Sequence, residues 1–523
     1  MELKGILDKS NSSGEILTTK EHKPCAEFLE GKYADSELII GLVGAVGTQL
    51  KYIADIIKER LKAYNYEPID IRVSKDVIEK MWRDSLKHSS EYERICNYIQ
   101  LGNIARELSK DNSILALGVA TEIMRRREKD EYGNTKPKKR VAYIINSLKH
   151  PEEVERLREI YSNGFFLIGI HSDEERRQKF LVQDIRMKEE EAKKLIERDM
   201  DEDYGHGQHT RDTFHMSDFF VHLDNNNDKV KHSIWRILDL VFGHPFLTPT
   251  FDEFAMFMAF TSALRSADLS RQVGAIIARD NEIIASGAND CPKAEGGLYW
   301  PEFDGDTNEI VDKHKGRDYK RGVDSNKMEQ AKIVDDILQC LGLGAEEKEK
   351  LAKSKIRDII EYGRVVHAEM EAILMCARNN LSTRGATLYC TTFPCHNCAK
   401  HIIAAGIKRV VYVEPYPKSK AFDFHDDSIC SKLLPGENKV EFVPFVGIGP
   451  RKFFDLFSMS LSSGYNLIRK DKKGYAVRWD SSIKGRLRCQ MLPVSYLDRE
   501  AMATYSFKEK SSEIKEKRGE VNE

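Results

Sequence analysis

Two short motifs in the C-terminal half of the chain constrain its fold most strongly. The first is His367-Ala368-Glu369 and the second is Pro394-Cys395-His396-Asn397-Cys398. They supply one imidazole and two thiols, which are ligand types that Zn²⁺ prefers. Because Cys395 and Cys398 are three residues apart, a helix that begins after Pro394 places both sulfurs on one face. A fold that brings His367 to the start of this helix assembles three ligands for one ion.

Three protein ligands leave a fourth position on zinc for water, as catalytic zinc sites require. Zinc lowers the pKa of a bound water from about 15.7 to about 7. The N-terminal end of a helix also favours the thiolate form of Cys395. Glu369 lies two residues after His367, so it points elsewhere and can move protons. We therefore predict His367, Cys395 and Cys398 as metal ligands and Glu369 as the catalytic acid–base.

The alternative is a structural zinc site, which needs four protein ligands. His396, His401 and Cys390 are the candidates for the fourth ligand. The two histidines share the predicted helix with the cysteines, but at offsets that turn them away from the sulfurs. This spacing favours the open, catalytic kind of site.

Composition excludes several classes of protein. With 523 residues and 41% hydrophobic content, two or three domains are expected. The 82 basic residues balance 84 acidic ones, which argues against a broad basic face for polynucleotides. Ten scattered cysteines do not resemble a secreted disulfide framework. Neither a signal segment nor a run of 18 apolar residues is found, so we predict a cytoplasmic protein without a membrane span.

Strand and helix patterns alternate along the chain, which predicts an α/β fold with a parallel sheet. Predicted strands cover residues 38–43, 69–73, 141–145 and 165–170, with helices at 49–64 and from 151. Glycine and proline near residue 245 predict a domain junction. The predicted units are a polar segment over 1–35, an α/β domain over 36–245, a second α/β domain over 246–505 and a disordered, charged tail over 506–523.

A glycine turn connects the first predicted strand to the first helix. Its candidate phosphate-binding residues are Gly44, Gly47, Thr48 and Lys51. Backbone N–H groups at such a turn can bind phosphate. The pattern departs from G-x-x-x-x-G-K-[ST], because Gln49 replaces the second glycine, Leu50 the lysine and Lys51 the Ser or Thr. Nucleotide binding and a simple tight turn both fit, whereas the missing lysine disfavours kinase chemistry.

The paired motifs resemble those of the cytidine and deoxycytidylate deaminase superfamily, whose signature is H-x-E followed by P-C-x-x-C. Arg265-Ser266-Ala267-Asp268 and Arg271-Gln272-Val273-Gly274-Ala275 resemble the segment that opens the dCMP deaminase domain. The resemblance covers roughly residues 250–450. It implies a cytidine-deaminase-like α/β/α domain, zinc on the three predicted ligands and a proton-shuttling role for Glu369.

The resemblance also nominates substrate contacts. The chain has Gly287-Ala288-Asn289-Asp290 where typical dCMP deaminases have Gly-Tyr-Asn-Gly. The retained asparagine implies contact with the sugar or base, whereas the missing tyrosine and second glycine argue against the usual triphosphate effector site. The predicted substrate-binding residues are Ser266, Arg271, Asn289, Tyr416 and Lys418.

A degenerate P-loop kinase-like domain ahead of such a deaminase resembles the bacterial anti-phage dCTP deaminases. This resemblance implies a zinc hydrolase that converts dCTP and dCMP to dUTP and dUMP and depletes the nucleotide pool during infection. It also implies a homo-oligomer, a nucleotide effector at the N-terminal domain and, in several members, an inhibitory small RNA. The alternatives are a polynucleotide cytosine deaminase and a nucleotide-sensing switch with the deaminase as its output.

Overall fold

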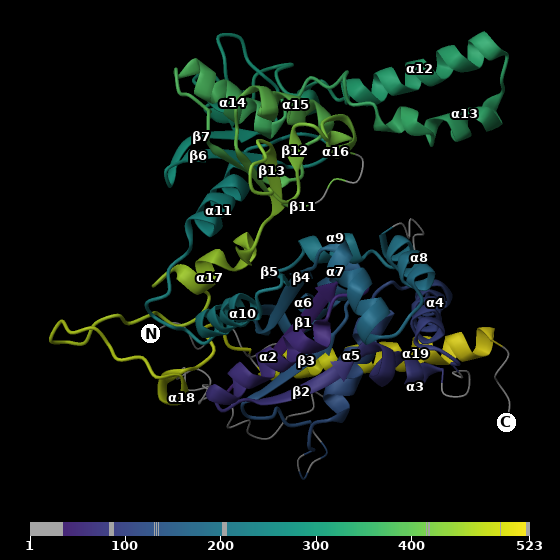
Figure 1. Ribbon diagram of the computed structural model, residues 1–523, viewed down its shortest axis with the longest axis vertical. Coiled ribbons are helices and arrows are strands. Elements are labelled where there is room, and N and C mark those ends of the chain that lie inside the picture. The colour runs from purple at the N-terminus through teal and green to yellow at the C-terminus, as the bar shows by residue number, and fades with distance from the viewer. Residues whose placement is uncertain are drawn as a thin grey trace, which may run out of the picture.

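The computed structural model describes residues 35–518, except for residues 83–87, 130, 132, 134, 201–206, 415, 417, 418 and 492. Two α/β domains, one N-terminal and one C-terminal, lie one above the other in Figure 1. Each is built on its own six-stranded sheet, which confirms the predicted α/β class. Nearly all of the predicted polar segment 1–35 lies outside the described residues. No helix in the described part of the chain is long and apolar enough to span a membrane.

The N-terminal sheet has five parallel strands and one antiparallel edge strand. In spatial order they are β14 (Gly447–Ile448), β5 (Phe219–His222), β4 (Phe165–His171), β1 (Leu38–Gly44), β3 (Val141–Asn146) and β2 (Glu67–Arg72). The predicted strands therefore correspond to β1 to β4. The sequence reading missed β5, whose four residues are too short for a clear periodic pattern.

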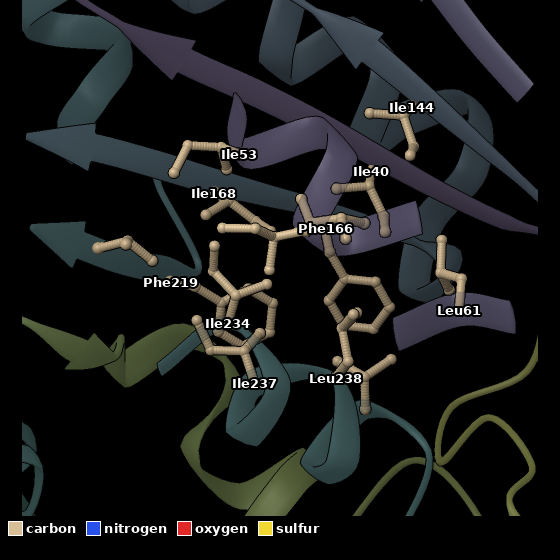
Figure 2. Close-up of a cluster of buried hydrophobic side chains, with 14 of the residues drawn as sticks. Ile40, Ile53, Leu61, Ile144, Phe166, Ile168, Phe219, Ile234, Ile237 and Leu238 are labelled. Carbon is tan, nitrogen blue, oxygen red and sulfur yellow. The ribbon is translucent and has the colours of Figure 1, made fainter. Parts of the chain in front are cut away.

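Helices cover both faces of this sheet because the residues of the central strand alternate between two cores. Leu38, Ile40 and Leu42 face one core, and Ile39 and Val43 face the other. Figure 2 shows the first core, between the sheet and two amphipathic helices. The helices of this domain include α2 (Leu50–Ala63), α3 (Glu79–Met81), α4 (Glu91–Ser109), α5 (Ile114–Arg125), α6 (Pro151–Tyr161), α7 (Glu174–Lys179), α8 (Glu189–Met200), α9 (Thr210–His215) and α10 (Asn227–Val241).

The last part of the chain returns to the N-terminal domain. Helix α17 (Phe453–Phe457) adds Leu456 to the first core. Helix α19 (Pro493–Lys517) adds Ile514 to the second core and lies beside α5 (Figure 1). This corrects the expectation of a disordered tail over 506–523, because residues through 517 are helical. It also places part of the predicted unit 246–505 within the N-terminal domain.

The C-terminal sheet is mixed. Its strands, in spatial order, are β12 (Ile429–Cys430), β13 (Val440–Pro444), β11 (Arg409–Glu414), β10 (Thr387–Thr392), β6 (Gly274–Arg279) and β7 (Glu282–Ala288). Helices α14 (Ala368–Arg378) and α15 (His396–Ala404) pack on one face. Helix α11 (Phe251–Ala263), which begins with a Thr250–Glu253 capping box, packs on the other face. The predicted helix after Pro394 is thus confirmed.

A long insertion separates β7 from α14. It contains a hairpin of β8 (Glu302–Asp304) and β9 (Glu309–Val311), followed by α12 (Ser325–Leu341) and α13 (Ala345–Ala352). Asp324 caps the start of α12, and Gly342 ends it in the left-handed region. The two helices project from the domain as an arm (Figure 1).

The two domains meet through a buried apolar cluster and an ion pair. Phe220 of β5 packs in one cluster with Met256 of α11 and Val411 of β11. Arg236 of α10 donates to both carboxylate oxygens of Glu253, at 2.7 and 2.8 Å. The same carboxylate accepts from the Ile448 backbone N–H at 2.9 Å, so it joins three segments of the chain.

Candidate active site

Two helix N-termini bring the predicted metal ligands together. His367 is the N-cap of α14 and Cys395 is the N-cap of α15. Both helices pack on the same face of the C-terminal sheet, and α15 follows directly after β10. The sheet therefore sets the positions of both motifs, although they are separated in the sequence.

The three ligand atoms form a compact cluster. The Nδ1 atom of His367 lies 3.4 Å from the Cys395 sulfur and 3.3 Å from the Cys398 sulfur. Two such ligands on a tetrahedral zinc ion lie about 3.5 Å apart, given Zn–N and Zn–S distances of about 2.0 and 2.3 Å. Hydrogen bonds from Cys398 and His367 lower the pKa of Cys395 to about 4, so a thiolate is present at neutral pH. The donor set fits zinc.

Glu369 lies beside this cluster and is almost fully buried, at 4% exposed. Burial raises the pKa of its carboxyl above the usual range, because the charged form is poorly solvated there. His367, Cys395 and Glu369 line one cavity of about 320 Å³. The site therefore combines a metal cluster, a proton carrier and room for a small ring.

Among the described residues, the cluster has three ligand atoms and no fourth. The ring of His396 packs against Phe424, and His401 Nδ1 lies 2.6 Å from the Asn397 carbonyl. Cys390 is buried on β10 but is not part of the cluster. The arrangement matches an open catalytic site better than a closed structural one.

The predicted substrate-binding residues fall into three groups. Arg271, Asn289 and Tyr416 line the cavity. Ser266 does not line it, but its hydroxyl donates to the Asn289 carbonyl at 2.6 Å. Lys418 lies outside the described residues.

Asn289 is held in place by the segment before β6. Its side-chain oxygen accepts from the Val273 N–H at 2.6 Å, and its amide nitrogen donates to the Arg271 carbonyl at 2.8 Å. The Arg271 guanidinium lies over the Tyr416 ring, 5.5 Å from its centre. Asn289 therefore orients the backbone that carries Arg271, in addition to lining the cavity.

Sequence reasoning missed one wall of the cavity, which the insertion provides. The wall includes Asn326, Lys327 and Gln330 of α12 and Arg357. Gln330 donates to the Ile359 carbonyl at 2.7 Å, which fastens α12 to the segment before His367. No local motif marks these residues in the sequence. The one sequence feature that pointed to this wall is that the insertion leads directly into His367.

The glycine turn lines a second cavity of about 300 Å³ in the N-terminal domain. Gly44, Gly47 and Thr48 line it, but Lys51 is exposed on α2 and does not. Lys149 stands at the cavity instead, and its Nζ donates to the Gly44 carbonyl at 2.9 Å. The structure thus brings three of the four predicted residues together and leaves Lys51 apart.

The turn already contacts an acidic side chain. The Val46 N–H donates to Asp199 Oδ2 at 2.8 Å, and Lys149 pairs with the same carboxylate at 3.3 Å. Gly47 has a φ of +84°, and a Cβ at this position would lie 2.9 Å from Arg177. The backbone of the turn therefore requires glycine here.

Comparison with known proteins agrees with this site. The family described as "Cytidine and deoxycytidylate deaminase zinc-binding region" matches residues 249–414. The deoxycytidylate deaminase of Enterobacteria phage T4 is 33% identical over 165 residues, which are 31% of this chain and 77% of that protein. The human deoxycytidylate deaminase is 28% identical over 195 residues, 37% of this chain and 79% of that protein.

A solved structure, that of dCMP deaminase from the cyanophage S-TIM5 in complex with dCMP and dUMP, is 20% identical. It covers 38% of this chain and 99% of its own, with a TM-score of 0.22.

The site and the matched region define a hydrolytic cytosine deaminase. The chain belongs to the deoxycytidylate deaminase family, whose members deaminate deoxycytidine nucleotides. The family model matches residues of the C-terminal domain, so the N-terminal domain is additional to the matched region.

Proposed function

We propose that the protein is a zinc-dependent deaminase that acts on dCTP as well as dCMP. His367, Cys395 and Cys398 would hold the ion, and the thiolate character of Cys395 supports this assignment. When bound, zinc supplies a water of lowered pKa for attack on C4 of cytosine. The observation that carries the proposal is the three-atom ligand cluster beside buried Glu369 in one cavity.

The side chains have distinct roles in this reaction. Glu369 would take one proton from the attacking water and deliver it to the ring nitrogen. It would then carry the second proton, from the hydroxyl formed on C4, to the amino group that leaves as ammonia. Its buried position excludes bulk water from this transfer. Asn289 would orient the nucleotide, because it lines the cavity and is itself fixed by two hydrogen bonds.

The test is to incubate the purified protein with dCTP, dCMP, CTP and dATP and to resolve the products. Uracil nucleotides should form from the deoxycytidine substrates. Glu369→Gln should lower kcat by about 10²–10⁴-fold while zinc content stays at the wild-type value. A zinc-loaded wild-type protein that leaves every cytosine substrate unchanged would contradict the proposal.

Use of the triphosphate is supported by basic side chains along the cavity. Arg271 lines one side, and Lys327 and Arg357 line the wall made by the insertion. A triphosphate needs more positive charge than a monophosphate, so these three side chains support dCTP, while Asp268, Asp318 and Asp324 line the same cavity. Lys327→Ala should raise KM for dCTP more than KM for dCMP. Lys332→Ala, which removes an exposed lysine from the same helix, is the matched control. Equal effects on both substrates would contradict this assignment.

The second candidate is deamination of single-stranded polynucleotide. The near-neutral charge of the chain speaks against it, because such substrates need a broad basic groove. Activity on a cytosine oligonucleotide that exceeds activity on dCTP, and that falls steeply with salt, would favour this candidate instead.

We also propose that the N-terminal cavity is a degenerate P-loop that binds a nucleotide or another phosphate ligand. Supporting features are the glycine turn, nearby Lys149 and the Thr48 hydroxyl, which is buried and has no hydrogen-bond partner among the described residues. Asp199 accepts a hydrogen bond from the Val46 N–H of the turn. Its carboxylate would therefore have to move away when phosphate binds to the turn.

Gly47→Asp tests this cavity because it places a charge and a side chain in the turn. Gly133→Asp is the control, since Gly133 has the same φ of +84° and a Cβ there meets no atom of the described residues within 4 Å. Nucleotide affinity should fall only in Gly47→Asp. Unchanged affinity would exclude the glycine turn as the binding site.

We propose, from the resemblance of the combined architecture, that deamination depletes the nucleotide pool during phage infection. Infected cells that carry the wild-type protein should lose dCTP, whereas cells that carry Glu369→Gln should keep it. Equal dCTP levels in both would argue against this role.

A further inference from the structure

A second cluster of ligand atoms lies in the N-terminal domain, outside the deaminase site. His171 is the last residue of β4 and His222 is the last residue of β5. The two strands are parallel neighbours and these residues are directly paired in register. Asp173 follows β4 by two residues and precedes α7. The ends of two strands thus bring two imidazoles and a carboxylate together.

The distances within this cluster suit a metal better than a hydrogen bond. The Nε2 atoms of His171 and His222 each lie 3.5 Å from the same oxygen of Asp173. An N–H···O hydrogen bond is about 2.7–3.2 Å long. A nitrogen and an oxygen on one tetrahedral ion lie about 3.4 Å apart, given metal–ligand distances of about 2.0–2.2 Å. One ligand atom from each residue lies within 4.8 Å of the others.

Two further details show that these polar atoms are not used elsewhere. His222 Nε2 is buried and has no hydrogen-bond partner among the described residues. Asp173 is the N-cap of α7, a position where an aspartate normally accepts from the helix N–H groups. Its side chain makes no such bond and faces the two rings instead.

The side chain of Arg176, a residue of α7, is held by groups other than Asp173. The guanidinium of Arg176 donates to the Asp224 carbonyl at 2.7 Å, to Asn225 Oδ1 at 2.8 Å and to Gln49 Oε1 at 3.0 Å. These bonds hold it against α2 and the loop after β5. In the described structure, the Asp173 carboxylate pairs with the two histidines.

We propose that His171, Asp173 and His222 form a second metal site, for a divalent transition ion such as Zn²⁺. Imidazole with one carboxylate suits zinc, iron or manganese, whereas Ca²⁺ and Mg²⁺ prefer oxygen ligands alone. Three protein ligands leave at least one coordination position open. The site lies at the carboxyl ends of parallel strands, which is where α/β sheets bind their ligands.

The site is close to the boundary between the domains. Residues of a strand alternate between its two faces, so His222 shares a face with Phe220. Phe220 packs edge-on against Phe445 of the C-terminal domain, with ring centres 5.7 Å apart. A metal at this position would therefore stabilise the edge of the N-terminal sheet that contacts the deaminase.

Cobalt titration of the full metal-free protein distinguishes the two metal sites. Cobalt bound by Cys395 and Cys398 gives a thiolate-to-metal charge-transfer band, whereas the second site has no thiolate and gives none. We expect two equivalents per chain, one with this band and one without it. If the catalytic metal assignment alone fails, the thiolate band is missing while the thiolate-free equivalent remains.

His222→Gln should weaken the thiolate-free equivalent by more than about tenfold and leave the charge-transfer band unchanged. His232→Gln removes an exposed histidine of α10 and serves as the control. The proposal would be overturned if the protein bound only one equivalent of cobalt, the one that gives the charge-transfer band. So would a second equivalent whose affinity is the same in wild type and His222→Gln. Asp173→Asn, a near-isosteric change, guards against loss of folding as the explanation.

Discussion

In the deaminase centre, buried Glu369 lies beside the three predicted metal ligands. His367, Cys395 and Cys398 were predictable because ligand type, spacing and helix start are all local properties. Asn289 was predicted as a substrate contact, but its hydrogen bonds to residues 271 and 273 depend on the β6–β7 hairpin. His171 and His222 carry no local signal, because only strand pairing makes them neighbours.

The buried side chain of His150 should make the free energy of unfolding depend on pH. His150 caps α6 by accepting the Glu152 N–H, and burial lowers its pKa to about 4. The unfolded state, with a histidine pKa of about 6.5, therefore binds the proton more tightly between these values. The free energy of unfolding should fall by up to about 3 kcal/mol as pH drops from about 6.5 to about 4.

His150→Asn isolates this effect, because asparagine can cap the helix but does not titrate in this range. Urea unfolding of both proteins at pH 7 and pH 4.5 gives the comparison. The wild type should lose more stability than the variant on acidification. An equal loss in both proteins would show that the charge on His150 does not matter.

At the scale of elements, the strongest surprise is helix α19. Its mean composition is charged, and the tail was therefore expected to be disordered. In the structure Phe507 and Ile514 pack on the second core, and Lys510 pairs with Asp111. A few apolar side chains on one face are enough to stabilise this helix, because they pack against the apolar surface of the second core. A sequence shows the helix period but not the distant surface that the helix covers.

Shortening one core side chain of α19 should destabilise the N-terminal domain. Ile514 is buried, so Ile514→Ala should cost about 2–5 kcal/mol through lost contacts and a cavity. Met502 of the same helix is 73% exposed, and Met502→Ala should change stability by less than about 0.5 kcal/mol. Denaturant unfolding monitored by circular dichroism measures both. If the two variants behave alike, α19 does not pack as described.

The arm formed by α12 and α13 contributes one wall of the cavity, which no motif in the sequence indicated. Its base places Lys327 and Gln330 at the wall, because Gln330 is bonded to the strand-like segment before His367. The length of an insertion can be seen in a sequence, whereas the surface against which it folds back depends on contacts across many residues.

At the scale of the whole molecule, one carboxylate couples the two domains. Glu253 is buried and bonds to Arg236 and to the Ile448 N–H, in addition to capping its own helix. Removing one partner of a buried ion pair typically costs about 3–5 kcal/mol. Glu253→Ala should therefore separate thermal unfolding into two transitions in calorimetry.

Lys231→Ala provides the comparison for this prediction. Lys231 pairs with Glu59 near the surface, where an ion pair contributes about 0–1 kcal/mol. This variant should unfold like the wild type. A Glu253→Ala protein with an unchanged, single transition would show that the apolar cluster alone couples the domains.

The return of α17 and α19 to the first domain has a consequence for protein synthesis. A ribosome makes strands β1 to β5 early, but it makes Leu456, Met491 and Ile514, which complete their cores, only after the deaminase domain. Because domains fold as units while the chain emerges, the deaminase can finish folding first, and the N-terminal cores must wait with apolar surface exposed. A translating cell would therefore hold a folded catalytic domain attached to an unfinished N-terminal domain until α19 leaves the ribosome.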